Sequence, residues 1–369
     1  MKYIKLKDVC KINMGQSPDS SSYNESGEGI PFFQGNADFG DRYPVTRIWC
    51  SEPKKVAQEN DILISVRAPI GAINYSKEKC CIGRGLAALT VDKTKISEKL
   101  LFWVLKAKKE ELNRQGTGST FKAISKKSLE ELLIPQIDIK EQEKDVEILE
   151  KIYMIIQNKH KELKLLTDLI SARFVEMFGD PIRNTQNRPT TKLINVVKMQ
   201  RGFDLPVQDR NQDGNIPVYG ANGVLDSHNT ARIHGGGVIT GRSGTIGKVF
   251  YTEGDYWPLN TSLFSVDKHG NNVIYLAYLL QMFDLTRFVE GTGVPTLNRN
   301  MFHNRQIIDV PINEQNQFAA FVQQVNKSKF VIHKFLYCFI DNKQSIIKPR
   351  LNTKESGKIR GGKPHADEF

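Results

Sequence analysis

Residues 62–76 read ILISVRAPIGAINYS, and residues 238–252 read VITGRSGTIGKVFYT. Each stretch begins with a short apolar run, passes through an arginine and a turn that contains glycine, and ends in a second short run. Short apolar runs separated by glycine indicate β-strands joined by a turn. The two stretches therefore predict one small β element that occurs twice, and they give the first alignment of the two halves of the chain.

Further matching segments flank this pair in the same order. Upstream, LKDVCKINMGQSP (6–18) aligns with LINVVKMQRGFDLP (193–206), and GIPFFQGNADF (29–39) aligns with NIPVYGANGVL (215–225). Downstream, CIGRGLAALTVDK (81–93) aligns with WPLNTSLFSVDK (257–268), and GTGSTFKAISKKSLEELLIPQI (116–137) with GTGVPTLNRNMFHNRQIIDVPI (291–312). Arg242 follows Arg67 by 175 residues, and Pro311 follows Pro135 by 176. The common order of the segments, with a nearly constant separation from residue 62 onward, predicts an internal duplication.

Each half is expected to end in a long helix. Apolar residues recur every seven positions, as Leu149, Ile156, Leu163, Ile170 and Met177 in the first half and as Phe318, Val325, Ile332, Phe339 and Ile346 in the second. A strict seven-residue apolar repeat is typical of a helix that packs against another helix as a coiled coil. Asp138 and Glu141 resemble a capping box at the first helix start, whereas Gly179 and Pro349 are expected to end the two helices. The alternative is that each helix lies on the core of its own module.

These patterns predict an α+β fold in which two β-rich domains are related by a pseudo-two-fold axis and separated by two long antiparallel helices. The predicted boundaries are 1–137 and 181–312 for the domains, 138–180 and 313–349 for the helices, and 350–369 for a tail. The tail is polar and lacks an apolar period, so we expect it to be disordered.

Composition favours a polyanionic partner. The formal net charge is +11, and neutralisation of phosphates by Lys and Arg is a principal term in DNA binding. A solvated basic surface is the alternative interpretation. The five cysteines form no CxxC pair, and no apolar run approaches the ~18 residues of a membrane span, so we expect a protein of the cytoplasm. The seven histidines are scattered, and no metal site is expected.

No motif for catalysis emerges from the sequence. No two of the fifteen prolines are adjacent, so the Pro-Pro-aromatic motif of amino-methyltransferases is absent. GRSGTIGK (241–248) departs from the phosphate-loop pattern in spacing, and Val249 replaces its Ser or Thr, so a turn between strands is the favoured interpretation. Pro18-Asp19 with Glu52 and Lys54 fits a nuclease pattern only loosely. The sequence therefore predicts a binding protein without catalytic residues.

Several paired segments together carry a family likeness over residues 1–348. They are Ile30, Pro31, Gly35 and Asn36 with Ile216, Pro217, Gly220 and Asn222; Ile134, Pro135, Glu141 and Gln142 with Val310, Pro311, Glu314 and Gln315; the Gly-Thr-Gly before each helix; and FVEMFGDP (174–181). The ordered set resembles the DNA specificity subunit of type I restriction-modification systems. The resemblance implies two target recognition domains, each reading half of a bipartite site on double-stranded DNA, and helices that set the distance between the half-sites.

The resemblance also implies partners that carry the chemistry. Two methyltransferase subunits would bind around the helices, restriction subunits would join them, and S-adenosylmethionine, ATP and Mg²⁺ would belong to those partners. A recognition subunit of another restriction-methylation enzyme and a duplicated coiled-coil scaffold without specific DNA binding remain as alternatives.

Loop residues with amide, guanidinium, hydroxyl or ammonium groups are the candidate DNA contacts, since such groups pair with base edges or phosphates. They are Gln34, Asn36, Arg67, Arg84, Ser119, Thr120 and Lys122 in the first copy, and Asn222, Arg242, Lys248, Asn260, Thr296, Asn298 and Arg299 in the second. Arg67 is paired with Arg242, and Thr120 with Thr296. The alternative for each is a loop residue that bonds its own backbone.

Overall fold

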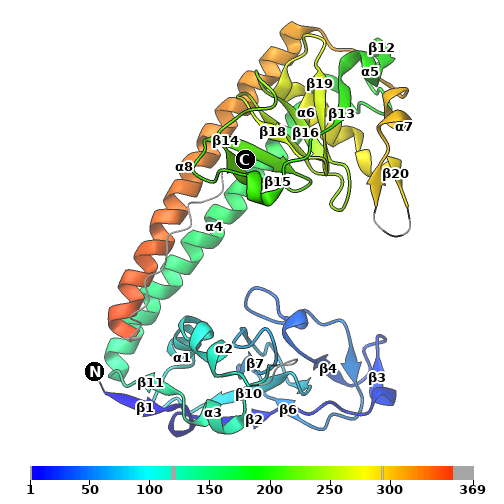
Figure 1. Cartoon of the computed structure of the whole chain (residues 1–369). Helices are drawn as coiled ribbons and strands as arrows, with labels where there is room; N and C mark the ends of the chain where they lie inside the picture. The colour runs from blue at the N-terminus through cyan, green and yellow to red at the C-terminus, as the bar shows by residue number, and fades with distance from the viewer. Residues whose placement is uncertain (1, 118–121, 292, 294, 352–369) are drawn as a thin grey trace. The chain divides into compact units, whose positions relative to one another are not determined.

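The computed structural model describes residues 2–117, 122–291, 293 and 295–351, with side chains as far as residue 338. The chain divides into two compact units, formed mainly by Met1–Gln157 and by Asn158–Leu336. Each unit contains a sheet-rich module and part of two long helices, α4 (Ile139–Phe178) and α8 (Ile312–Leu351) (Figure 1). The α+β class is confirmed, and the predicted tail lies almost entirely outside the described residues.

The first module is built on two antiparallel-rich sheets. One has the order β2-β10-β7-β8, with bounds Cys10–Met14, Leu86–Val91, Ile62–Ser65 and Ile73–Tyr75. The other has the order β3-β5-β4-β9-β6, with bounds Tyr23–Asn24, Trp49–Cys50, Ile30–Phe33, Cys80–Ile82 and Val56–Ala57. The strands β1 (Tyr3–Lys5) and β11 (Leu133–Pro135) pair separately, so the start of the module lies beside its end.

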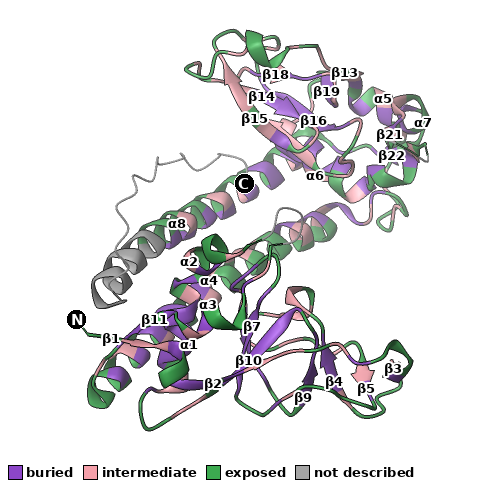
Figure 2. Ribbon diagram, turned by 60° about the horizontal axis from the view of Figure 1, so that its bottom comes forward, coloured by how far each residue is buried: buried purple, intermediate pink, exposed green. Residues whose placement is uncertain are grey.

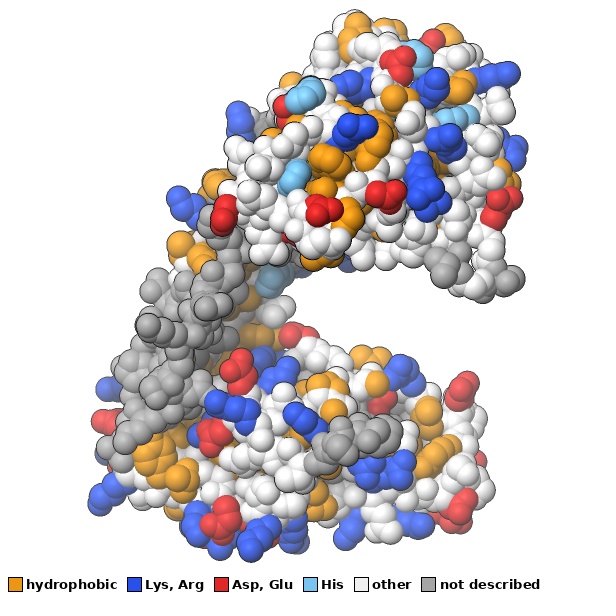
Figure 3. All heavy atoms as spheres, viewed as in Figure 1, with side chains coloured by type: hydrophobic (Ala, Val, Ile, Leu, Met, Phe, Trp, Pro, Cys, Tyr) orange, Lys and Arg blue, Asp and Glu red, His pale blue; other side chains and the backbone are white. Residues whose placement is uncertain are grey.

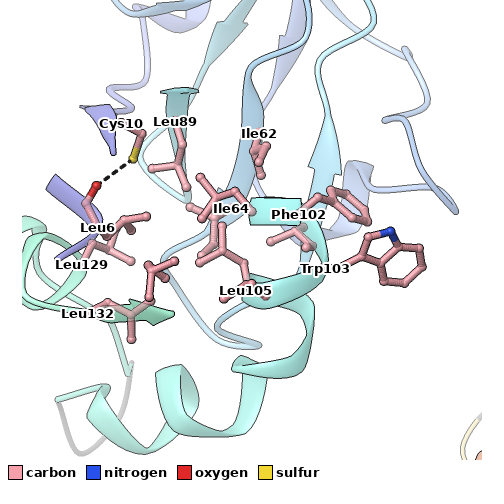
Figure 4. Close-up of a cluster of buried hydrophobic side chains, with 14 of the residues drawn as sticks. Leu6, Cys10, Ile62, Ile64, Leu89, Phe102, Trp103, Leu105, Leu129 and Leu132 are labelled. Atoms are coloured by element: carbon pink, nitrogen blue, oxygen red, sulfur yellow. Dashed lines mark hydrogen bonds between the residues drawn. The ribbon is translucent and has the colours of Figure 1, made fainter. Parts of the chain in front are cut away.

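The core of the first module lies between the β7 sheet and helix α1 (Glu98–Ala107). All four residues of β7 are buried, and so are the first four residues of its neighbour β10 (Figure 2). Figure 4 shows Leu89, Ile62 and Ile64 from the sheet facing Phe102 and Leu105 from the helix. Trp103 lies at the margin of this cluster, where the module meets α4. The close packing of these side chains holds the four-stranded sheet and α1 together.

The second module repeats this plan. Its four-stranded sheet has the order β13-β19-β16-β17, with bounds Lys198–Arg201, Ser262–Asp267, Gly237–Gly241 and Val249–Thr252. Helix α6 (Val273–Phe283) takes the place of α1. A three-stranded sheet has the order β15-β14-β18, with bounds Gly223–His228, Ile216–Gly220 and Trp257–Pro258, and β12 (Thr190–Lys192) pairs with β22 (Gln306–Ile308). The matching strand order supports the predicted duplication.

Matched backbone bonds correct the register of the duplication. The Val66 amide donates to Gly85 at 2.9 Å, and the Arg242 amide donates to Thr261 at 2.8 Å, so equivalent residues here are 176 apart. The Val66 carbonyl then accepts from the amide of Ile124, and the Arg242 carbonyl accepts from the amide of Leu297, which is a separation of 173.

Two predicted residue pairs are therefore wrong. Arg242 corresponds to Val66 and not to Arg67, because Arg242 follows the equivalent strand residue Val238 by four positions, whereas Arg67 follows Ile62 by five. Thr296 corresponds to Ala123 and not to Thr120, since the bridge between Arg67 and Ala123 has its counterpart between Ser243 and Thr296. The loop before that bridge is shorter in the second copy, which brings the separation down to 173.

A buried glutamine fixes the start of each long helix. Gln142 accepts from the Ser97 amide at 2.8 Å and donates to the carbonyl of Ile137 at 2.8 Å. In the second module, Gln315 accepts from the Asn272 amide at 2.9 Å and donates to Val310 at 2.8 Å. Both helices contain 40 residues, and their bounds are 173 positions apart. The prediction that a separation of 176 continues through the helices is wrong by three residues, so Leu149 corresponds to Val322.

Within the second unit the two helices lie side by side and antiparallel (Figure 1). Phe178 and Phe174 of α4 both contact Phe318 of α8, with ring centroids 5.6 Å and 5.4 Å away. Arg173 lies 5.8 Å from the ring centroid of Phe321, so decreasing numbers on one helix meet increasing numbers on the other. The same phenylalanines pack against Tyr275 of α6, so the helices lie on the module core as well as on each other.

The predicted apolar repeat is largely buried. Leu149, Ile156, Ile170, Phe318, Val325 and Ile332 are buried, and Leu163 and Met177 are half-buried. The side chains of Phe339 and Ile346 lie outside the described residues. Helix α4 ends at Phe178 and is followed by Gly179 with a φ of 76°, as expected. Helix α8 continues to Leu351, two residues past the proline expected to end it, because a proline in the last turn removes only one helical hydrogen bond.

Candidate nucleic-acid interface

A ladder of backbone bonds brings four loops of the first module together. The Gln34 carbonyl accepts from the Gly85 amide at 3.1 Å, and the Gly85 carbonyl accepts from the Val66 amide at 2.9 Å. The Val66 carbonyl accepts from Ile124 at 2.9 Å. We call the exposed candidates on these loops the first reading edge, which consists of Gln34, Arg67, Arg84 and Lys122. The ladder therefore juxtaposes residues that lie far apart in the sequence.

Glycine is required where the first two loops meet. A Cβ atom at Gly85 would overlap the carbonyl oxygen of Gln34, and one at Gly83 would lie 3.0 Å from the Cα of Gln34. The loop that follows Gln34 is further held by Asp38, whose carboxylate accepts from the amides of Gln34 and Gly35 at 2.7 Å and 3.2 Å. Asn36 is half-buried in that loop. Ser119 and Thr120 lie outside the described residues.

The second module has an equivalent edge. The Arg242 amide donates to Thr261 and its carbonyl accepts from Leu297, both at 2.8 Å, so the loops of Asn260, Arg242 and Thr296 lie side by side. Residues 241–248 join the paired strands β16 and β17, which confirms the turn expected for GRSGTIGK. Gly244 and Gly247 have φ values of 83° and 99° within it, a region that favours glycine. We call Asn222, Arg242, Lys248, Asn260 and Thr296 the second reading edge.

Three predicted contacts already bond within the protein. Asn298 accepts from the Asn300 amide at 3.1 Å as the cap of α7 (Arg299–His303), and it donates to Glu290 at 3.0 Å. The Asn260 amide donates to Asp204, and the Arg242 Nε donates to the Asn260 carbonyl at 2.9 Å. Asn298 and Arg242 bond nearby backbone groups, as the alternative interpretation expects, whereas Asn260 bonds the side chain of Asp204. Asn222 and Lys248 are exposed, and Arg299 is half-buried.

Arg201 is a candidate that the sequence alignment did not single out. It is exposed at the end of β13, and Leu263 of β19 pairs with both Arg201 and Thr240, so Arg201 and Arg242 lie at the same end of the sheet. Burial and the charge of Arg201 lower the pKa of Arg242. Such a pair suits a phosphate oxygen. In the sequence, only its position directly before Gly202 could have indicated Arg201. The Gly202 amide donates to the Ser262 carbonyl, as the Gly15 amide donates to the Leu86 carbonyl in the first copy.

The chemistry of the remaining surface is that of a basic binding protein. Figure 3 shows Lys and Arg side chains spread over both units on the visible face, among fewer acidic ones. Within the described ranges, no group of three His, Cys, Asp or Glu side chains is placed to hold a metal ion. None of the helices in that part of the chain is long and apolar enough to cross a membrane. Burial raises the pKa of Cys10 to about 12, which keeps that thiol protonated at neutral pH.

Comparison with known proteins points to one family. The sequence model of the type I restriction modification DNA specificity domain matches residues 1–167 and 189–348. Over 152 residues the chain is 47% identical to the candidate MjaX type I restriction enzyme specificity subunit of Methanocaldococcus jannaschii, covering 41% of the chain and 36% of that protein. It is 25% identical over 195 residues to the MjaIX type I restriction enzyme specificity subunit of the same organism, covering 49% of the chain and 45% of that protein.

These alignments span less than half the length of the curated relatives. A solved structure of the type I restriction-modification S subunit from M. genitalium aligns over 94% of the chain and 95% of its own length. The sequence identity is 15% and the TM-score is 0.59, so this likeness shows the fold of the whole chain.

Proposed function

Because the chain belongs to the type I restriction modification DNA specificity domain family, we propose that it selects the DNA sequence for a type I restriction-modification complex. The observation that carries the proposal is the repeated backbone ladder. In each module it sets exposed or half-buried amide and guanidinium side chains along one edge. Guanidinium groups pair with guanine edges, and amides pair with adenine edges. Each module would therefore read one half of a bipartite site on double-stranded DNA.

The helices supply the distance between the half-sites in this proposal. Each contains 40 residues, which corresponds to a length of about 60 Å at a rise of about 1.5 Å per residue. Two methyltransferase subunits would dock on the helices, and restriction subunits would join them. S-adenosylmethionine, ATP and Mg²⁺ would act on those partners, and this chain would contribute sequence recognition in the cytoplasm without a catalytic group.

Methylome sequencing tests the proposal directly. The chain is produced with its methyltransferase partner in a host that lacks other adenine methylation, and the host without the chain is the control. We expect one bipartite adenine-methylated motif that depends on the chain. A methyltransferase that modifies the same motif without the chain would contradict the proposal, and a chain-dependent motif that is continuous would favour another class of restriction-methylation enzyme.

The length of the helices gives a second readout. Removal of seven residues from each helix shortens the pair by about 10 Å, which is about three base pairs of DNA. We expect the spacer in the motif to shorten by that amount while both half-sites keep their sequence. A change in the half-sites themselves would contradict the division of roles between modules and helices.

A further inference from the structure

A cluster of charged and aromatic side chains joins a loop of the first module to helix α4. The Nη2 atom of Arg42 lies 2.7 Å from each carboxylate oxygen of Glu150. The indole Nε1 of Trp103 donates to the same carboxylate at 2.9 Å. Tyr153, one turn along the helix, donates its hydroxyl hydrogen to Asp41. We call these five residues the loop clamp, and all of them lie in the first unit.

The clamp is stronger than an ordinary surface ion pair. The guanidinium carbon of Arg42 lies 4.5 Å from the ring centroid of Tyr153 and 5.7 Å from that of Trp103. The side chains of Arg42 and Glu150 are each only 25% exposed. Partial burial reduces screening by water, and an ionised acceptor with several donors makes short, strong hydrogen bonds. Removal of one partner would leave a half-buried charge without its counterion.

The loop held by the clamp carries part of the first reading edge. It leaves β4 at Phe33, begins with Gln34 and Asn36, and returns to β5 at Trp49. The Arg42 carbonyl accepts from the Tyr75 amide at 2.8 Å. The Asn74 side chain accepts from the Gly40 amide at 3.1 Å and donates to its carbonyl at 3.2 Å. The loop is therefore fixed to the sheet at its middle and to α4 through its side chains.

The second module is built differently at the equivalent place. Strand β14 ends at Gly220 and β15 begins at Gly223, so a short turn replaces the loop. The residue that corresponds to Glu150 on α8, 173 positions later, is Gln323. Its amide lies 3.4 Å from Glu253 and is exposed. Among the described residues, the backbone bonds that form the second reading edge come from its own strands and loops, and none of them involves Gln323 of α8.

We propose that Arg42 and Glu150 are positioning residues, which fix the loop of Gln34 and Asn36 on α4 and so determine how sharply the first module discriminates its half-site. This inference rests on the proposed function for its DNA readout. The structural half of it, the dependence of the loop on the helix, can be measured without DNA.

The test compares Glu150→Gln and Arg42→Lys with two controls in the complex of the full chain with its methyltransferase partner. Glu147→Gln removes a carboxylate from the same helix, in an exposed pair with Lys151 where the side chains are 66% and 71% exposed. Gln323→Ala changes the equivalent position of the second module. Glu150→Gln keeps the shape of the side chain and removes its charge. Arg42→Lys keeps the positive charge and removes the planar guanidinium that lies over the ring of Tyr153.

Two measurements are made on each variant. Hydrogen exchange of the amides of residues 34–48 reports the loop, and binding to DNA with a single base changed in one or the other half-site reports discrimination. For Glu150→Gln we expect loop exchange to rise and first half-site discrimination to fall, each about tenfold, because charge-assisted bonds are lost. Second half-site discrimination should stay unchanged, Arg42→Lys should be intermediate, and both controls should match the wild type.

Unchanged loop exchange in Glu150→Gln, or equal losses at both half-sites, would overturn the positioning role and leave the proposed function standing. A wild-type complex that discriminates neither half-site would instead overturn the proposed function and this inference with it.

Discussion

Replacement of the buried Gln142 by alanine tests the anchor between the first module and its helix. Gln142 is 1% exposed and takes part in three hydrogen bonds, to the Ser97 amide at 2.8 Å and to the carbonyls of Ile137 and Lys95 at 2.8 Å and 3.4 Å. A typical bond contributes about 1 kcal/mol net, so two short bonds and one long bond correspond to about 2–3 kcal/mol. Gln315→Ala should have an equal effect in the second module, where its partners are Asn272, Val310 and Asn271.

Hydrogen exchange at single amides is the suitable assay, because a chain with two modules does not unfold in one step and its total unfolding free energy is not well defined. The Ser97 amide loses its acceptor in Gln142→Ala, and the Asn272 amide loses its acceptor in Gln315→Ala. We expect each amide to exchange about thirtyfold to one hundredfold faster, since about 1.4 kcal/mol corresponds to a factor of ten. Gln136→Ala, an exposed glutamine just before α4, is the matched control.

If Gln142→Ala accelerates exchange of the Ser97 amide less than threefold, Gln142 does not anchor the helix to the module. An effect in one module without its counterpart in the other would show that Gln142 and Gln315 are not equivalent. The separation of 173 residues, and with it the corrected register of the helices, would then be wrong.

Three further predictions concern the helix pair, the clamp and the first reading edge. Lys329 is 8% exposed on α8, and burial lowers its pKa; its ammonium therefore destabilises the fold below the folded pKa, and this destabilisation is relieved as the pH rises toward the unfolded value of about 10.4. Lys329→Met should stabilise the helix pair at neutral pH by about 1 kcal/mol, so that the α8 amides around position 329 exchange about fivefold more slowly and depend less on pH in the alkaline range. Faster exchange of these amides would contradict this. Burial opposes ionisation of the Glu150 carboxyl, but hydrogen bonds from Arg42 and Trp103 outweigh burial and lower its pKa. The stabilisation of the fold by this carboxylate should therefore be complete above the unfolded pKa of about 4.3 and be lost as the pH falls through the folded pKa. The protection of the amides of residues 34–48 from hydrogen exchange should fall in this way down to pH 3 in the wild type and should not change with pH in Glu150→Gln. Wild-type protection that does not change with pH would contradict the role of the clamp. Gly85→Ala should break the bond to Gln34 and destabilise the first module by about 1–3 kcal/mol, measured as faster hydrogen exchange of the β10 amides. Gly254→Ala, with open space around it, should leave exchange in its own module unchanged.

The duplication and the helical seam were predictable because both are patterns within the sequence. Paired strands repeat their apolar runs, and buried positions such as Ile170 and Val325 recur at the heptad period. The drop in separation to 173 was not predictable, because a loop that shortens by a few residues leaves no periodic trace. Only bonded pairs such as Ser243 and Thr296 reveal which residues are equivalent.

The candidate site was harder to predict, because one side chain suits several roles. Asn298 has the amide group of a base reader, yet an asparagine directly before a helix is also a preferred cap, and the structure places it as one. The role of Arg42 could not be predicted, because its partner Glu150 is 108 residues away in the sequence. Local sequence patterns give no information on contacts between residues so far apart. The exposure of Arg201 at the same end of the sheet as Arg242 likewise depends on how the strands assemble.

The end of helix α4 has a consequence for how such a chain can be divided. Phe174 and Phe178 belong to the first copy of the duplication, but their rings are fully buried against Tyr275 and Phe318 of the second. A fragment that starts after Pro181 would expose that aromatic pocket to water, and it could fold completely only by accepting the helix of another polypeptide. The core of the second copy is therefore completed by the C-terminal end of α4, a helix that begins in the first copy.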